Sequence, residues 1–250
     1  MPQALLLVLR YEGPVRLAFG APFEDDKNRK DIAMKVVSLN VAVPHTVVWK
    51  GHEVRTGIFK KPVEEPVMMR RLNLDGDRQA DLTVHGGPAK AVYAYPSEHY
   101  SLWKIELPGM ALPWGMFGEN LTTEGMIEHE IHIGDKFRIG EAIVMVTQPR
   151  TPCYKLALKF ERDDMLKRML TNGRSGFYLA VEQQGIVKAG DAIQRIHEDP
   201  ERISIAEINT LYRDGGKDAN LLKRAANLEA LPESWRDYLR EELKSLEQAT

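Results

Sequence analysis

The pattern of apolar and polar positions changes character once along the chain, near residue 197. Before that point, short apolar runs alternate with turn residues, which is typical of β-strands. The clearest case is Lys136–Ile139 and the run 142–146, joined by Gly140 and Glu141. A two-residue turn that begins with glycine predicts a β-hairpin here. Two further short apolar runs, 177–181 and 193–196, predict additional strands.

Two helices are expected to interrupt these strands. One begins after Ser97, a plausible N-cap, and ends before Pro108. The other covers roughly residues 163–170, where the apolar residues fall on one helical face. Many short strands with a few inserted helices predict a mixed, mainly antiparallel barrel or sheet.

Helical spacing dominates after residue 197. Ser204 and Glu207 form a capping-box pattern that predicts the start of a first short helix. Gly215 and Gly216 should end it, and a second helix is expected over about 218–226. A third helix should begin at Pro232, a residue favoured in the first helical turn. These elements predict a small all-α three-helix domain.

The first 33 residues differ from the rest, because residues 10–33 mix glycine, proline and charge without a clear period. We therefore expect an N-terminal extension of unknown role over 1–33, a mainly β domain over 34–197 and the three-helix domain over 198–250. The longest N-terminal apolar run, residues 4–9, is far shorter than the roughly 20 residues of a spanning helix.

Composition narrows the function classes. The 250 residues carry a formal net charge of −2, which argues against a protein that coats nucleic acid. The single cysteine excludes an internal disulfide, a CxxC redox pair and a cysteine-rich zinc site. We therefore expect a cytoplasmic protein with no membrane partner and no stable nucleic-acid binding.

That cysteine, Cys153, lies in an unusual setting. It follows a predicted strand and is preceded by Pro152, so a stiff loop is expected to present the thiol. Arg150 and Lys155 flank it, and nearby cations favour the reactive, metal-binding thiolate. An inert buried thiol is the alternative, and local context leaves both interpretations open.

Three other motifs could bind a ligand, although each alone is as typical of a simple turn. Gly86, Gly87 and Lys90 could bind an anion, and His85 could donate to an oxygen. Glu119 and Asn120 could hydrogen-bond a heterocycle. Arg174, between Gly173 and Gly176, is a reasonable phosphate contact.

In combination and in this order, these motifs resemble the MOSC domain, the molybdenum cofactor sulfurase C-terminal domain, over about residues 36–195. The three-helix segment strengthens the likeness to the YiiM-like subfamily, which is associated with resistance to 6-hydroxylaminopurine. The matching residues are Gly76-Asp77, His85-Gly86-Gly87, Tyr95-Pro96, His99-Tyr100, Phe117-Gly118-Glu119-Asn120-Leu121, Gly134-Asp135, Gln148-Pro149-Arg150, Pro152-Cys153-Tyr154-Lys155-Leu156 and Gly190-Asp191.

The resemblance implies a β-barrel-like core that binds a molybdopterin-type molybdenum cofactor. Cys153 would supply a thiolate to molybdenum and is thus the catalytic and metal-binding candidate, with His85 as a second catalytic candidate. The candidates for holding the cofactor are Arg150, Lys155, Tyr154, Asn120, Glu119, Gly86, Gly87, Lys90 and Arg174.

The resemblance further implies an oxidoreductase that reduces N-hydroxylated bases or amines, such as 6-hydroxylaminopurine, and thereby detoxifies them. One cysteine cannot hold an iron–sulfur cluster, so a separate electron-donating reductase, such as a flavoprotein, is expected. A homodimer is a further option. Two alternatives stay open: a molybdopterin carrier or sensor without turnover, and a metal-free thiol enzyme in which His85 activates Cys153.

Overall fold

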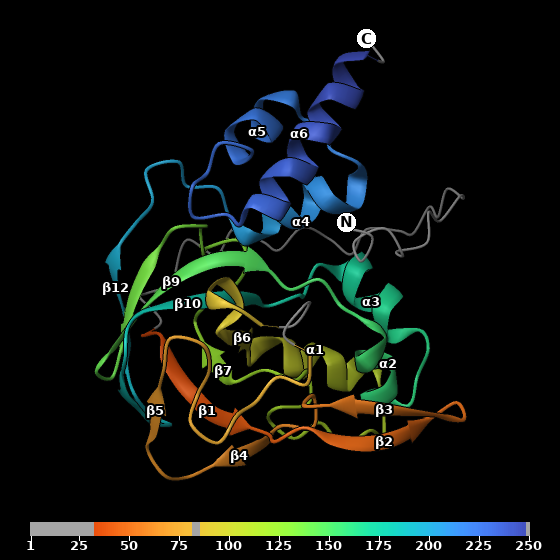
Figure 1. Cartoon of the computed structure of the whole chain (residues 1–250), viewed down its shortest axis with the longest axis vertical. Coiled ribbons are helices and arrows are strands. Elements are labelled where there is room, and N and C mark those ends of the chain that lie inside the picture. The colour runs from red at the N-terminus through yellow and green to blue at the C-terminus, as the bar shows by residue number, and fades with distance from the viewer. Residues whose placement is uncertain (1–32, 82–85, 249–250) are drawn as a thin grey trace. The chain divides into compact units, whose positions relative to one another are not determined.

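The computed structural model describes residues 33–81 and 86–248 (Figure 1). The predicted extension over 1–33 and the candidate His85 therefore lie outside the described residues, apart from Ala33. The first described strand is β1 (Lys35–Val41).

The centre of the fold is an eight-stranded mixed sheet. Its strand order is β12-β8-β9-β10-β6-β7-β1-β4, and neighbours pair antiparallel except for β6 and β7, which pair in parallel. The prediction of a mixed, mainly antiparallel sheet is confirmed. The strands after β1 are β4 (Lys61–Val63), β6 (Val92–Pro96), β7 (Leu121–Glu124), β8 (Lys136–Ile139), β9 (Ala142–Pro149), β10 (Phe177–Gln183) and β12 (Ile193–His197).

Backbone hydrogen bonds join one edge of this sheet to β1, the strand next to its other edge. The Val36 amide donates to the Asp191 carbonyl at 2.9 Å, and the Gly190 amide donates to the Val36 carbonyl at 2.8 Å. The Ile193 amide likewise donates to the Met34 carbonyl at 2.8 Å. The start of β1 is thus joined to the turn before β12, which gives the barrel-like core that the resemblance implied.

The predicted hairpin is confirmed: β8 and β9 pair with Ile139 opposite Ala142, across Gly140 at φ 54°. A left-handed backbone of this kind favours glycine. Two smaller sheets complete the strands. One pairs β2 (His45–Trp49) with β3 (His52–Thr56), and the other pairs β5 (Val67–Met69) with β11 (Gly185–Val187).

Three α-helices and one short 3-10 helix are inserted among the strands. α1 (Glu98–Glu106) and α3 (Met165–Asn172) confirm the two predicted helices, and η1 (Pro88–Lys90) follows the paired glycines. Ser97 precedes α1, but its backbone is already helical and its side chain makes no capping bond. The expected Ser97 cap is therefore corrected.

α2 (Tyr154–Phe160) was not predicted and begins directly after Cys153. Cys153 has extended backbone (φ −125°, ψ 169°) at the N-cap position, which corrects the expectation that a stiff loop after the strand presents the thiol. Pro152 lies before the helix and does not interrupt it. The helix is stabilised because Leu156 and Phe160, one helical turn apart, are buried in an aromatic cluster.

That cluster packs α1 and α2 against β6. The rings of Tyr95 and Phe117 stack with centroids 4.3 Å apart, and the Trp103 indole donates to the Tyr95 hydroxyl at 2.6 Å. Buried aromatic pairs with satisfied polar groups fix the position of the elements that carry them. The N-terminal end of α2 is thereby held next to the sheet.

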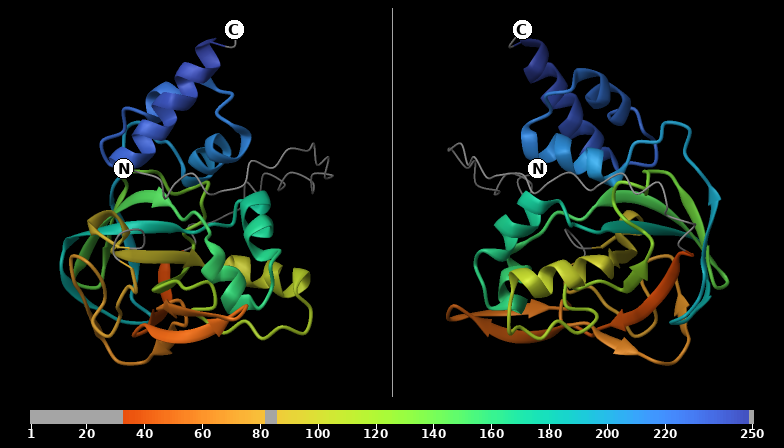
Figure 2. Two further views of the ribbon diagram at one scale, coloured as in Figure 1. Left: turned by 45° about the vertical axis from the view of Figure 1, so that its right-hand side comes forward. Right: turned by 180° about the vertical axis from the view of Figure 1, so that it is seen from behind.

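The three predicted C-terminal helices are confirmed as α4 (Ile205–Asp214), α5 (Ala219–Ala225) and α6 (Glu233–Gln248) (Figures 1 and 2). α4 lies against β9, and the apolar residues of the helices join the hydrophobic core of the strands. The Ile205 amide donates to the Ile131 carbonyl at 2.9 Å. Within the part of the chain that the structure describes, no helix combines the length and apolar character needed to cross a bilayer.

The capping box at the start of α4 gives a first test. The Glu207 amide donates to the Ser204 hydroxyl at 3.1 Å, and the Ser204 amide donates to the Glu207 carboxylate at 2.7 Å. Ser204→Ala should lower the free energy of unfolding by about 1 kcal/mol in urea denaturation. Ser245→Ala, which removes an exposed hydroxyl within α6, serves as the control and should stay within about 0.5 kcal/mol of wild type. Equal losses in both variants would contradict a capping role.

Candidate functional site

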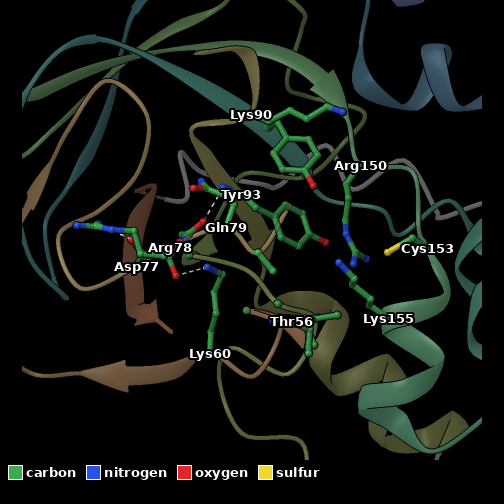
Figure 3. Close-up of a pocket in the computed structure, with 16 residues that line it drawn as sticks. Thr56, Lys60, Asp77, Arg78, Gln79, Lys90, Tyr93, Arg150, Cys153 and Lys155 are labelled. Carbon is green, nitrogen blue, oxygen red and sulfur yellow. Dashed lines mark hydrogen bonds and ion pairs between the residues drawn. The ribbon is translucent and has the colours of Figure 1, made fainter. Parts of the chain in front are cut away.

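A pocket lies where the β9–α2 junction faces β6, the segment after β3 and the loop after β5 (Figure 3). Segments far apart in the sequence therefore build its wall. The lining residues are Thr56, Gly57, Ile58, Lys60, Asp77, Arg78, Gln79, Ala80, Lys90, Tyr93, Gly118, Asn120, Arg150, Cys153, Lys155 and Tyr178.

The charge of this wall is strongly unbalanced. It contains one carboxylate, that of Asp77, and five cationic side chains, those of Lys60, Arg78, Lys90, Arg150 and Lys155. Burial lowers the pKa of Lys60, although Asp77 opposes that effect, and burial also lowers the pKa of Lys90. Cations that outnumber the acids of the same wall favour an anionic ligand.

Cys153 faces two of these cations. Figure 3 shows the end of Arg150 beside the thiol and the end of Lys155 beside the guanidinium, and both residues are more than nine-tenths buried. Burial opposes the charge of Arg150, but Tyr93, Tyr178 and Cys153 together raise its pKa above the usual value. The guanidinium also lies over the Tyr93 ring, 5.0 Å from its centroid. Arg150 therefore stays charged beside the thiol.

On the opposite wall, the Asp77 carboxylate is held by three donors. It forms a buried ion pair with Lys60, accepts from the Ala42 amide at 2.9 Å and accepts from the Asn120 side chain at 3.0 Å. The Asn120 side-chain oxygen accepts from the Tyr93 amide at 3.1 Å. Asn120 thus lines the pocket as predicted, but its amide serves mainly to join the two walls.

The structure brings together five of the predicted site residues and leaves five others outside the pocket wall. Cys153, Arg150, Lys155, Asn120 and Lys90 line one pocket. The residues that do not line it are Glu119, Arg174, Tyr154, Gly86 and Gly87.

Glu119 and Arg174 are occupied by internal contacts. The Glu119 carboxylate is fully buried and accepts from the Tyr100 hydroxyl, from the Gly115 amide at 2.8 Å and from the Phe117 amide at 3.0 Å. Arg174 pairs with Glu106 at 2.6 Å on α1. Such contacts hold turns and helices in place rather than bind a ligand.

Tyr154 and the paired glycines also lie outside the pocket wall. The Tyr154 side chain is 51% exposed although it follows Cys153, because the first turn of α2 directs it to the surface. Gly87, at φ 94°, is the N-cap of η1, and neither it nor Gly86 lines the pocket. Gly87 instead begins the short helix that carries Lys90. His85 lies outside the described residues.

Sequence analysis missed several lining residues. Tyr93 and Tyr178 lie opposite one another on β6 and β10, so the strand register would have revealed them as one pair. Asp77 belongs to a motif that carried the family resemblance, but no local pattern links it with Lys60. Thr56, Arg78 and Gln79 carry no signal that the sequence alone would single out.

Comparison with known protein families gives two adjacent matches. The MOSC domain matches residues 81–194, and the YiiM-like 3-alpha helix domain matches residues 203–245. Both ranges fall inside the predicted segments 34–197 and 198–250, whose outer boundaries stay predictions.

Similar proteins include YflK of Bacillus subtilis, 42% identical over 80% of this chain and 90% of its own. YiiM of Escherichia coli is 35% identical over 72% of this chain and 81% of its own. The chain belongs to the YiiM-like MOSC-domain family. A protein named "Reductase" in Gibberella moniliformis is 30% identical over 78% of this chain, but the match covers only 35% of that protein.

Solved structures support the same assignment. The crystal structure of YiiM from Geobacillus stearothermophilus matches with a TM-score of 0.71 and 35% identity, covering 84% of this chain and 99% of the other. The pocket draws Cys153 and Arg150 from the matched MOSC range and Lys60 and Asp77 from residues before it. The site of this family member thus depends on chain outside the matched range.

Lys159 of α2 joins the two walls of the pocket. Its amine donates to the Ile58 carbonyl at 2.8 Å and to the Gly115 carbonyl. Since Ile58 lines the pocket, this lysine ties the helix that follows Cys153 to the opposite wall. Burial lowers the pKa of Lys159 from 10.5 to about 7.

This shift predicts a pH-dependent stability. The unfolded chain keeps the amine protonated up to pH 10.5, whereas the folded protein releases the proton near pH 7. Between these values the unfolded state binds more protons, so the free energy of unfolding gains a term that rises with pH. The wild-type value minus the Lys159→Met value should therefore increase over this range in denaturant titrations.

Lys104→Met, which removes an exposed lysine of α1, is the matched control and should not show this trend. A wild-type minus Lys159→Met difference that stays constant across the same pH range would contradict the effect of burial on Lys159.

Proposed function

We propose that this protein is a molybdenum-cofactor-dependent reductase of N-hydroxylated bases and amines, with 6-hydroxylaminopurine as a representative substrate. The observation that carries the proposal is the buried cationic cluster around the only cysteine, in a chain of the MOSC family. The similar protein named "Reductase" supports the redox class.

The pocket residues suit such a cofactor. A thiolate is a soft ligand and fits a metal that the cofactor already holds through dithiolene sulfur. Among the described residues, no group of three or more histidine, cysteine or acidic side chains could hold a metal by itself. Cys153 is therefore suited to complete a ligand set that arrives with the cofactor. Arg150, Lys155 and Lys90 are suited to its negative charge.

Reduction of an N-hydroxylated amine consumes two electrons and two protons, breaks the N–O bond and yields the amine and water. When bound, the cofactor supplies the two-electron chemistry. The chain orients the substrate, and solvent supplies the protons. Burial raises the pKa of the Tyr178 hydroxyl, so it stays protonated beside Arg150 and can donate a hydrogen bond to a bound oxygen. The Tyr178 ring, which lines the pocket, is suited to contact a flat base.

The electrons need an external donor, because one cysteine cannot hold an iron–sulfur cluster. We propose a separate flavoprotein reductase as that donor. The match with the fungal protein named "Reductase" leaves most of that protein's length without a counterpart here, which supports a donor supplied by another polypeptide. The notion of a homodimer stays a prediction.

The direct test uses cofactor-loaded protein, a reduced viologen as artificial electron donor and 6-hydroxylaminopurine. Wild-type protein should form adenine, and Cys153→Ser should lose at least about a hundredfold of that rate, since loss of metal-site residues has effects of this order. Tyr154→Phe is the matched control, because its side chain is adjacent in sequence but outside the pocket. It should retain wild-type activity.

Two results would contradict the proposal in distinct ways. Cofactor retained without adenine formation would favour a carrier or sensor. Activity that persists in metal-free protein would favour a thiol enzyme that uses Cys153 directly.

A further inference from the structure

The loop of residues 173–176, between α3 and β10, supports two side chains of the pocket. The Tyr93 hydroxyl donates to the Ser175 carbonyl at 2.7 Å. The Arg150 amide donates to the Gly176 carbonyl at 3.2 Å. Arg150 lies over the Tyr93 ring, so the loop holds both partners of this cation–π pair.

The loop has little freedom at Gly176. Its φ is 61°, and a Cβ there would lie 2.4 Å from the Ala94 carbonyl oxygen. Only glycine fits a backbone that comes so close to β6. A change in the support of this loop is therefore expected to move Tyr93 and Arg150.

One support is a buried acid–histidine pair that the proposed reaction does not use. The Glu128 carboxylate accepts from the Gly176 amide at 2.8 Å and lies 2.7 Å from the His99 ring nitrogen Nε2. Burial alone would raise the pKa of Glu128, but His99 and the Gly176 amide hold it below its usual value. Glu128 is thus an ionised acceptor, and the facing nitrogen of His99 donates.

The second support comes from the C-terminal helices. The Asn209 side chain of α4 donates to the Ser175 hydroxyl at 2.8 Å. It also approaches the Gly173 carbonyl at 3.4 Å. The loop is consequently held by the MOSC segment on one side and by α4 on the other.

We propose that Glu128 and Asn209 are positioning residues that set Arg150 and Tyr93 in the pocket through the loop 173–176. The C-terminal helices thereby help to shape the pocket itself. The proposal builds on the anion-binding role given to Arg150 above, but it concerns the placement of that charge and holds in the protein without cofactor or substrate.

Cys153 provides the probe, because it is the only cysteine of the chain. Its sulfur displaces iodide from iodoacetamide, which is neutral, and from iodoacetate, which is anionic and of similar size. Accessibility and thiolate content affect both rates together, whereas a nearby positive charge favours the anionic reagent. The ratio of the iodoacetate rate to the iodoacetamide rate therefore reports the charge beside the thiol.

Relative to wild type, Arg150→Gln should lower this ratio at least about threefold, because a charge within a Debye length is removed. Glu128→Gln and Asn209→Ala should each lower it about twofold, since Arg150 remains but is displaced. Thr210→Ala, on the same helix, removes a hydroxyl that bonds only within α4 and should leave the ratio unchanged. If Glu128→Gln does not fold, the rate ratio of Asn209→Ala alone still tests the proposal.

Three results would overturn the proposal. They are a wild-type ratio in both Glu128→Gln and Asn209→Ala, a wild-type ratio in Arg150→Gln, and a drop in Thr210→Ala equal to that in Asn209→Ala. Absence of reductase activity in the wild-type holoprotein would refute the proposed function and leave these ratios, and the positioning role, intact.

Discussion

An excess of positive charge over negative charge around a single thiol, among the described lining residues, is the constraint on which the rest of the site depends. Burying cations is unfavourable unless they pair with an opposite charge. Asp77 pairs with Lys60 and so neutralises only one of the pocket's cations. The fold nevertheless holds Arg150 and Lys155 away from water beside Cys153. A protein that keeps such an arrangement is suited to an anion that enters the pocket and supplies the missing charge.

The architecture shows how this unfavourable cluster is kept in place. The aromatic cluster fixes α2, and with it Cys153 and Lys155. Asn120 and Asp77 join the opposite wall to β6 through a chain of buried hydrogen bonds. Arg150, Lys155 and Asp77 are therefore carried by segments whose positions the fold fixes, as an electrostatically organised site requires.

Elements that depend on residues close together in the sequence could be predicted, whereas the partners of the site residues depend on contacts between distant segments. The hairpin around Gly140 and the Ser204 capping box depend on neighbouring residues, so the sequence alone predicts them. Glu119 and Arg174 look like ligand contacts in sequence, but the partners that occupy them are set by the fold. Lys60 carries no motif and enters the pocket only because β3 and β4 place it opposite Cys153. The sequence does not predict α2, because a proline before Cys153 is as typical of a loop as of the segment that precedes a helix.

The most direct measurement of the central claim is the molybdenum content of the protein purified from a host that makes the cofactor. Elemental analysis of wild-type protein should give roughly one molybdenum per chain, as expected for one cofactor held by one thiolate. Replacement of Arg150 by glutamine should reduce that content, because the buried positive charge would no longer attract the anionic ligand. Wild-type protein without molybdenum that still reduces 6-hydroxylaminopurine would contradict the account.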